Sequence, residues 1–133
     1  MLNKKEILSY LEANGLDDYE EIEYKEDALL LRVYYDFDSD EISSAKAYSN
    51  DECEDEEESE TWFDEFFLPY LNDIAVDNVG EVIEELMEDK ELNAQYVIYE
   101  TDSENYETCE FIVVFSEKDK EYEIEEILDE LEL

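Results

Sequence analysis

The chain is poor in several residue types that catalysis and metal binding commonly use. Its 133 residues include no histidine, two cysteines, two glycines, one proline and a single arginine, Arg32. Without histidine there is no imidazole base for a Ser-His or Cys-His pair and no ordinary zinc site. One arginine and the lack of a glycine-rich loop disfavour phosphoryl transfer. We therefore expect a protein that is not an enzyme and that uses no cofactor and no metal.

Long apolar segments are also lacking. No apolar run approaches the roughly 18 residues that a membrane span requires. The first twenty residues have no continuous apolar stretch typical of a secretory signal. Two cysteines, Cys53 and Cys109, do not make a disulfide framework in a chain of this size, so both are expected to be free thiols. These features together predict a cytoplasmic protein.

Acidic residues dominate what is present. The chain has 45 Asp and Glu against 8 Lys and Arg, a formal net charge of −37. Nucleic acid and anionic lipid surfaces would repel such a chain, so we expect no direct binding to nucleic acid or membrane. Yet 44% of the residues are hydrophobic and 14% are aromatic. Disordered acidic tails are poor in such residues, so the sequence predicts one folded acidic domain over residues 1–133.

Hydrophobic periodicity predicts the regular elements. Asn3 followed by Glu6 resembles a capping box and predicts a helix over 3–14. Alternating apolar residues predict strands near 21–24 and over 28–37, joined as a hairpin. Apolar residues at helical spacing predict helices over 61–74 and 78–90, with a kink or restart near Leu68 because Pro69 follows.

The remainder of the chain repeats this pattern. Two strands around 96–99 and 109–115 form a second hairpin, and a helix follows at 124–131. A shift of 75 positions superimposes the two helix–hairpin units, although generic amphipathic helices match about as well by chance. Residues 38–60 are expected to form an acidic mobile loop, of which 42–48 could extend a strand. The predicted fold is α+β: two antiparallel hairpins in one sheet, with about four helices, in the order α-β-β-loop-α-α-β-β-α.

Asp36, Asp38 and Asp40 match the D-x-D-x-D opening of a calcium-binding loop. Such a loop also needs glycine at its sixth position and a bidentate glutamate at its twelfth. Glu41 and Ala47 occupy these positions, so a specific calcium site is not expected. The tyrosines of the predicted strands are read mainly as core or cross-strand partners, and outward ones such as Tyr34 could be interface anchors.

Net charge of this size opposes folding. Two carboxylates about 6 Å apart repel by roughly 0.7 kcal/mol in water, and solubility alone needs a net charge of only about 2–8. The excess is therefore expected to serve binding of a cationic partner, through rows of carboxylates spaced like backbone phosphates. The candidate partner-binding residues are Asp36, Asp38, Asp40, Glu41, Asp51, Glu52, Glu54, Asp55, Glu56, Glu57, Glu58, Glu60, Glu84, Glu88 and Glu125.

In size, charge, aromatic content and absence of catalytic residues, the whole chain resembles the small acidic nucleic-acid mimics of phages and mobile elements, the anti-restriction and anti-CRISPR inhibitors. These inhibitors share no motif, so the resemblance carries over no functional residue. It implies a stoichiometric inhibitor that occupies the DNA- or RNA-binding channel of a nuclease or guide-RNA complex. Two alternatives fit the same electrostatics: an immunity protein against a basic nuclease toxin, and an acidic adaptor or chaperone for a basic protein. The oligomeric state stays open, a homodimer included.

Overall fold

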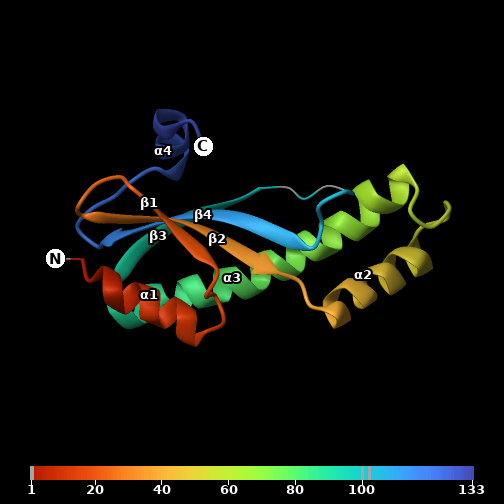
Figure 1. Cartoon of the computed structure of the whole chain (residues 1–133), viewed down its shortest axis with the longest axis horizontal. Coiled ribbons are helices and arrows are strands. Elements are labelled where there is room, and N and C mark those ends of the chain that lie inside the picture. The colour runs from red at the N-terminus through yellow and green to blue at the C-terminus, as the bar shows by residue number, and fades with distance from the viewer. Residues whose placement is uncertain (1, 100, 102) are drawn as a thin grey trace.

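The computed structural model describes residues 2–99, 101 and 103–133 (Figure 1). It confirms the predicted α+β class and one antiparallel sheet. The elements, in chain order, are α1 (Lys4–Ala13), β1 (Tyr19–Ile22), β2 (Ala28–Asp36), α2 (Ser39–Glu52), the π-helical segment η1 (Trp62–Phe67), α3 (Leu68–Lys90), β3 (Leu92–Tyr99), β4 (Thr108–Glu117) and α4 (Ile124–Leu131).

The sheet has the strand order β1-β2-β4-β3, and every neighbouring pair is antiparallel. Each hairpin therefore contributes its second strand to the centre. Leu31 of β2 pairs with Val113 of β4, which in turn pairs with Tyr96 of β3. The two central strands are buried on both faces, because helices cover the sheet from both sides.

The larger core lies between the sheet and the helices α1 and α3, which lie along one face (Figure 1). Alternate residues of β2 and β4, such as Leu31 and Phe115, point into this core. Their neighbours Leu30 and Val114 point to the opposite face, where they pack with Ile127 of α4 in a smaller core. The helix α4 thus covers the sheet face that α1 and α3 leave open (Figure 1).

The prediction of a loop over 38–60 was wrong for residues 39–52, which form α2, and the strand expected over 42–48 is absent. Asp38 caps this helix: its carboxylate accepts from the Glu41 backbone N–H at 2.8 Å, and the Glu41 carboxylate accepts from the Asp38 N–H at 3.1 Å. This capping box satisfies two backbone donors at the helix start. Ala45 and Ser49 are then buried on the inner face. Within residues 39–60, only residues 53–59 lie outside helices.

The helix restart near Leu68 is confirmed, since η1 changes into α3 at this residue. The predicted break between residues 74 and 78 was wrong, because α3 continues to Lys90. Gly80 lies inside this helix and allows β3 to approach closely. A Cβ at position 80 would lie 2.7 Å from the hydroxyl oxygen of Tyr96. Glycine is therefore used here for packing rather than as a helix end.

Candidate anionic interface

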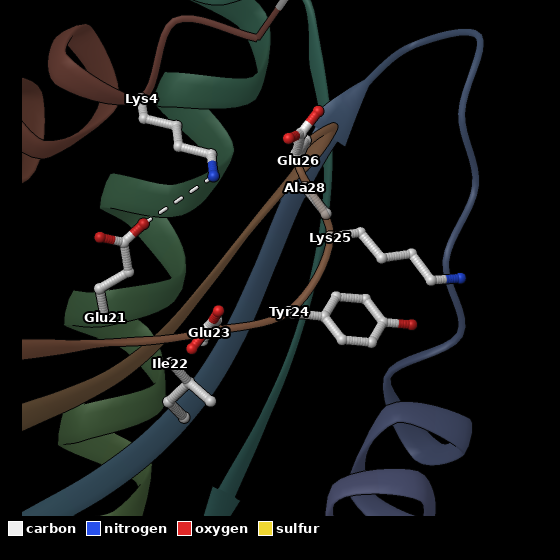
Figure 2. A pocket seen from close by; sticks show the side chains of 8 residues that line it. All are labelled: Lys4, Glu21, Ile22, Glu23, Tyr24, Lys25, Glu26 and Ala28. Atoms are coloured by element: carbon white, nitrogen blue, oxygen red, sulfur yellow. Dashed lines mark ion pairs between the residues drawn. The ribbon is translucent and has the colours of Figure 1, made fainter.

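Several lysines lie at one end of the molecule, around the turn between β1 and β2: Lys25 is in this turn, and Lys4 and Lys120 pair with Glu21 and Asp27 beside it. A surface hollow of about 310 Å³ lies at this turn. The Lys4 ammonium lies 3.9 Å from a carboxylate oxygen of Glu21, which also lines the hollow (Figure 2). Lys25 points away from this pair. Its ammonium lies 5.4 Å from the ring centres of both Tyr24 and Tyr122, within cation–π range.

Further ion pairs hold carboxylates near this end and on the sheet. Nitrogen–oxygen distances are 3.7 Å for Lys90 with Glu6 and for Lys120 with Asp27. On the sheet, the Arg32 Nε lies 2.7 Å from Glu110 Oε1, and a guanidinium nitrogen lies 3.9 Å from Glu20. Each of these carboxylates has a basic partner. The anionic potential is therefore partly neutralised here.

The opposite end of the molecule carries carboxylates with almost no basic residues. We define the acidic arm as α2, the connection 53–61, η1 and the first turn of α3, through Leu71. Its α2 and the adjoining start of α3 extend beyond the strands (Figure 1). Lys46 is the only basic residue between positions 36 and 81. Within the described ranges no ion pair involves an arm carboxylate. The exposed carboxylates of the arm are Asp40, Asp51, Glu52, Glu54, Asp55, Glu56, Glu57, Glu58, Glu60, Asp64 and Glu65.

The interior of the arm is apolar and keeps the two helical segments together. Trp62 is 1% exposed and stacks on Phe67, with ring centres 4.7 Å apart. Its indole N–H donates to the Asn50 Oδ1 at 2.9 Å, which ties η1 to the end of α2. A buried tryptophan with a satisfied N–H stabilises a unique packing. The repelling carboxylates around it are therefore carried by a packed structure.

A second acidic surface follows the solvent side of α3. We define the α3 ridge as Asp73, Asp77, Glu81, Glu84 and Glu88, all of which are exposed. At 3.6 residues per turn, these positions fall within a sector of about 80° and span about 22 Å along the helix. The buried residues of α3 face the sheet on the other side of the helix. The ridge therefore starts at the arm and follows the helix toward the end with the lysines.

Several predicted site residues have local structural roles. Thr108 donates its hydroxyl to the Asp36 carboxylate at 2.7 Å, and Asp38 caps α2. Glu41 accepts from the Tyr35 hydroxyl at 2.8 Å, and Asn78 donates to the same hydroxyl oxygen at 2.7 Å. Burial, followed by the hydrogen bond to Glu41, raises the pKa of Tyr35 to about 12. These bonds join β2, α2 and α3 and thereby position the arm.

The other predicted residues divide between surfaces. The structure brings the Asp51–Glu60 carboxylates together at the tip of the arm and places Glu84 and Glu88 on the ridge. Glu125 lies on α4, which covers the opposite sheet face, so it does not join them (Figure 1). Tyr34 is half-buried on β2, outside the arm.

The sequence prediction missed three ridge residues, Asp73, Asp77 and Glu81. Their signal was present in the sequence: acidic residues at i+4 spacing, offset from the apolar stripe of the same helix. The predicted break between residues 74 and 78 hid this signal, since it divided the row between two helices. A continuous helix aligns all five carboxylates.

In the described part of the chain, no group of three or more Cys, Asp or Glu side chains has the arrangement of a metal site. No helix in that part is both long enough and apolar enough to span a bilayer. Both cysteines are free thiols, and burial raises the pKa of Cys109 to about 11. Comparison with protein-family models, curated proteins and solved structures gives no match. The functional argument therefore rests on the residues themselves.

Proposed function

We propose that the chain is a stoichiometric inhibitor that mimics nucleic-acid charge and blocks the DNA- or RNA-binding channel of a host defence nuclease, of the anti-CRISPR or anti-restriction kind. The observation that carries the proposal is the continuity of the acidic arm with the α3 ridge. Within the described ranges no ion pair involves its exposed carboxylates, whereas Glu6, Glu21 and Asp27 near the lysines each have one. A surface kept free of counter-charges within the protein is available to cations of a partner.

The dimensions support this proposal. The helix from η1 to Glu88 is about 40 Å long at 1.5 Å per residue. Duplex DNA of that length carries about 24 phosphates. Over the 22 Å of the ridge alone, one strand of a duplex carries about six phosphates, against the five ridge carboxylates. A channel built for a phosphate backbone would therefore meet a similar density of negative charge.

The lack of other chemistry is compatible with inhibition by occupancy. A mimic needs a rigid charged surface and fast association with its target, which electrostatic steering supplies. The packing of Trp62 against Phe67 and the capping box at Asp38 give the arm this rigidity. The partner we infer is a basic nucleic-acid-binding protein, a nuclease or a guide-RNA complex.

The test begins with affinity capture from nuclease-treated lysate of the host cell. The bait is the full chain, and the control bait has the five ridge residues changed to Lys. The captured protein is purified and its nucleic-acid cleavage is titrated with the chain. We expect cleavage to fall to zero near one equivalent, and duplex or guide RNA to compete for the partner.

Capture of a basic protein that does not act on nucleic acid would refute nuclease inhibition and point to an adaptor. Capture of a toxin nuclease encoded beside the chain would point to an immunity protein.

Single substitutions are expected to do little, because the surface acts collectively. An exposed Glu→Gln change should weaken binding by about 0.5 kcal/mol or less. A charge reversal of the whole ridge should weaken it by orders of magnitude at low salt. The matched control reverses five exposed carboxylates in and next to α4, which covers the other face of the sheet: Glu123, Glu125, Glu126, Asp129 and Glu130. Equal losses from the two sets would contradict the assignment of the arm and ridge.

A further inference from the structure

One aromatic side chain of the acidic arm lies open to solvent. Tyr48 is 41% exposed, and no other large hydrophobic side chain among the described residues is classed as exposed. Its ring stacks on Tyr70 with centres 5.0 Å apart and planes at 28°, and Phe66 lies 6.4 Å away. The rings come from α2, α3 and η1, so this aromatic pair spans the arm where its two helical segments meet. Part of the Tyr48 ring surface remains uncovered.

Three exposed carboxylates lie one helical turn beyond these tyrosines. Asp51 and Glu52 follow Tyr48 by three and four residues on α2, and Asp73, the first ridge residue, follows Tyr70 by three residues on α3. Such spacings place Cβ atoms about 5–6 Å apart on one helix face. Lys46, two residues before Tyr48, lies roughly 200° away around α2 and so does not face the pair. The charged side chains that these spacings place beside the ring are thus all carboxylates.

This combination matches one chemical group, the guanidinium of arginine. Its planar, weakly hydrated cation stacks on aromatic faces while its N–H groups form paired hydrogen bonds to carboxylates. The lysine ammonium attracts the same carboxylates but lacks the plane and the paired donors. An apolar partner would bury the surrounding carboxylates without compensation, and a second copy of the chain would bring a second set of carboxylates against them.

We propose that Tyr48, supported by Tyr70, is an arginine anchor: an arginine of the cationic partner stacks on the Tyr48 ring while Asp51, Glu52 or Asp73 accepts its N–H groups. The proposal rests on the function proposed above and adds the side chain that the surface recognises. The carboxylates of the arm and ridge supply attraction to any cation. The tyrosine pair supplies the preference for arginine over lysine.

The experiment measures binding of the full chain to two peptides of equal length and charge, one of arginines and one of lysines, by fluorescence anisotropy. We expect both peptides to bind at low salt, with the arginine peptide tighter. The Tyr48→Ala variant should lose about two- to fivefold of its affinity for the arginine peptide and little for the lysine peptide. The Tyr48→Phe variant keeps the ring face and should retain the preference. Tyr24→Ala, at the lysine-bearing end of the molecule, is the control and should leave both affinities unchanged.

The outcomes separate the anchor from the broader proposal. If both peptides bind and the preference survives Tyr48→Ala, the anchor is refuted while the cation-binding surface stands. If Tyr48→Phe loses the preference as fully as Tyr48→Ala, the aromatic face is not the determinant and the anchor is again refuted. If neither peptide binds even at low salt, both the anchor and the proposed function are contradicted. Far-UV circular dichroism of each variant shows that it is folded before its affinity is compared.

Discussion

Neutralising the α3 ridge should make the fold more stable at low salt. The variant changes Asp73 and Asp77 to Asn, and Glu81, Glu84 and Glu88 to Gln. These side chains are exposed and solvated, so the changes remove negative charge with little effect on packing. Helix propensities of the paired residue types are similar, and their difference adds little. The charge itself is then the only large difference between the two proteins.

The magnitude follows from the spacing of the ridge. Its neighbours stand at i+3 or i+4, which makes four adjacent like-charge pairs, each destabilising by about 0.2–0.5 kcal/mol. Glu88 also lies in the last turn of α3, where the helix dipole disfavours negative charge. We expect the variant to gain about 1–2 kcal/mol in the free energy of unfolding. For a chain of this size that corresponds to a rise of about 3–8 °C in Tm.

The assay is urea unfolding followed by far-UV circular dichroism, at about 0.05 M and about 1 M NaCl. At 1 M salt the Debye length falls to about 3 Å, shorter than the spacing of the carboxylates. The difference between wild type and variant should therefore shrink strongly at high salt, because screening stabilises the wild type more. A gain of similar size at both salt concentrations, or no gain at low salt, would refute this reasoning.

A matched control neutralises five carboxylates that have basic partners. These are Glu6, Glu20, Glu21, Asp27 and Glu110, which pair with lysines or with Arg32. Removing them also lowers the net negative charge by five but breaks attractive contacts. This variant should gain less than the ridge variant, or lose stability. Equal gains would mean that total charge matters and its placement does not.

Three further predictions concern the fold itself. Gly80→Ala should destabilise the wild type by about 1 kcal/mol or more, because the added Cβ overpacks against Tyr96. In a Tyr96→Phe background the nearest ring carbon lies 3.6 Å away, so the same change should stabilise the fold by up to about 1 kcal/mol. The same sign of the effect in both backgrounds, measured by urea unfolding, would contradict the contact. The hydrogen bond from Tyr122, aided by Lys120, holds the pKa of Asp27 below its ordinary 3.8. The stability that this bond adds is therefore present above pH 3.8 and is lost as the pH falls below it. Asp27→Asn should make the free energy of unfolding depend less on pH in this acid range, and an unchanged dependence would argue against the bond. Burial raises the pKa of Cys109 to about 11, so a thiol reagent should label this cysteine only after unfolding. Cys53, which follows α2 and is only half-buried, should react in the native protein. Rapid labelling of both cysteines would be inconsistent with the buried position of Cys109.

The sheet was predictable because its two central strands have apolar residues at every second position. In β2 and β4, apolar residues face one core at every second position, and the intervening residues are apolar as well because α4 covers the other face. The helix α1 was predictable from its cap, since the side-chain Oδ1 of Asn3 accepts from the Glu6 backbone N–H at 3.2 Å. Local sequence patterns were sufficient where the apolar positions that they marked are the ones buried in the fold.

The acidic arm was not predicted as a structural unit, because its helix α2 shows no apolar stripe in the sequence and is held by polar caps and by contacts with distant residues. The helix α2 buries only Ala45 and Ser49, so it lacks an apolar stripe, and its capping box at Asp38 and Glu41 was read as part of an acidic loop. The helix α3 runs through the break predicted between residues 74 and 78, because Ala75, within this break, and Val79, just after it, are both buried on the same helix. The sequence therefore predicted that an acidic surface binds the partner, but not the arrangement of its carboxylates. Asp73, Asp77 and Glu81 entered it only once the helix was continuous.

Competition with nucleic acid tests the central claim most directly. The captured basic partner is titrated with labelled chain in the presence of increasing duplex DNA or guide RNA, at fixed salt. If the arm and ridge occupy a phosphate-binding channel, the apparent Kd of the chain should rise in proportion to the nucleic-acid concentration, and the ridge-reversed variant should not displace nucleic acid. A ternary complex, in which the partner holds chain and nucleic acid together at full affinity, would contradict the account.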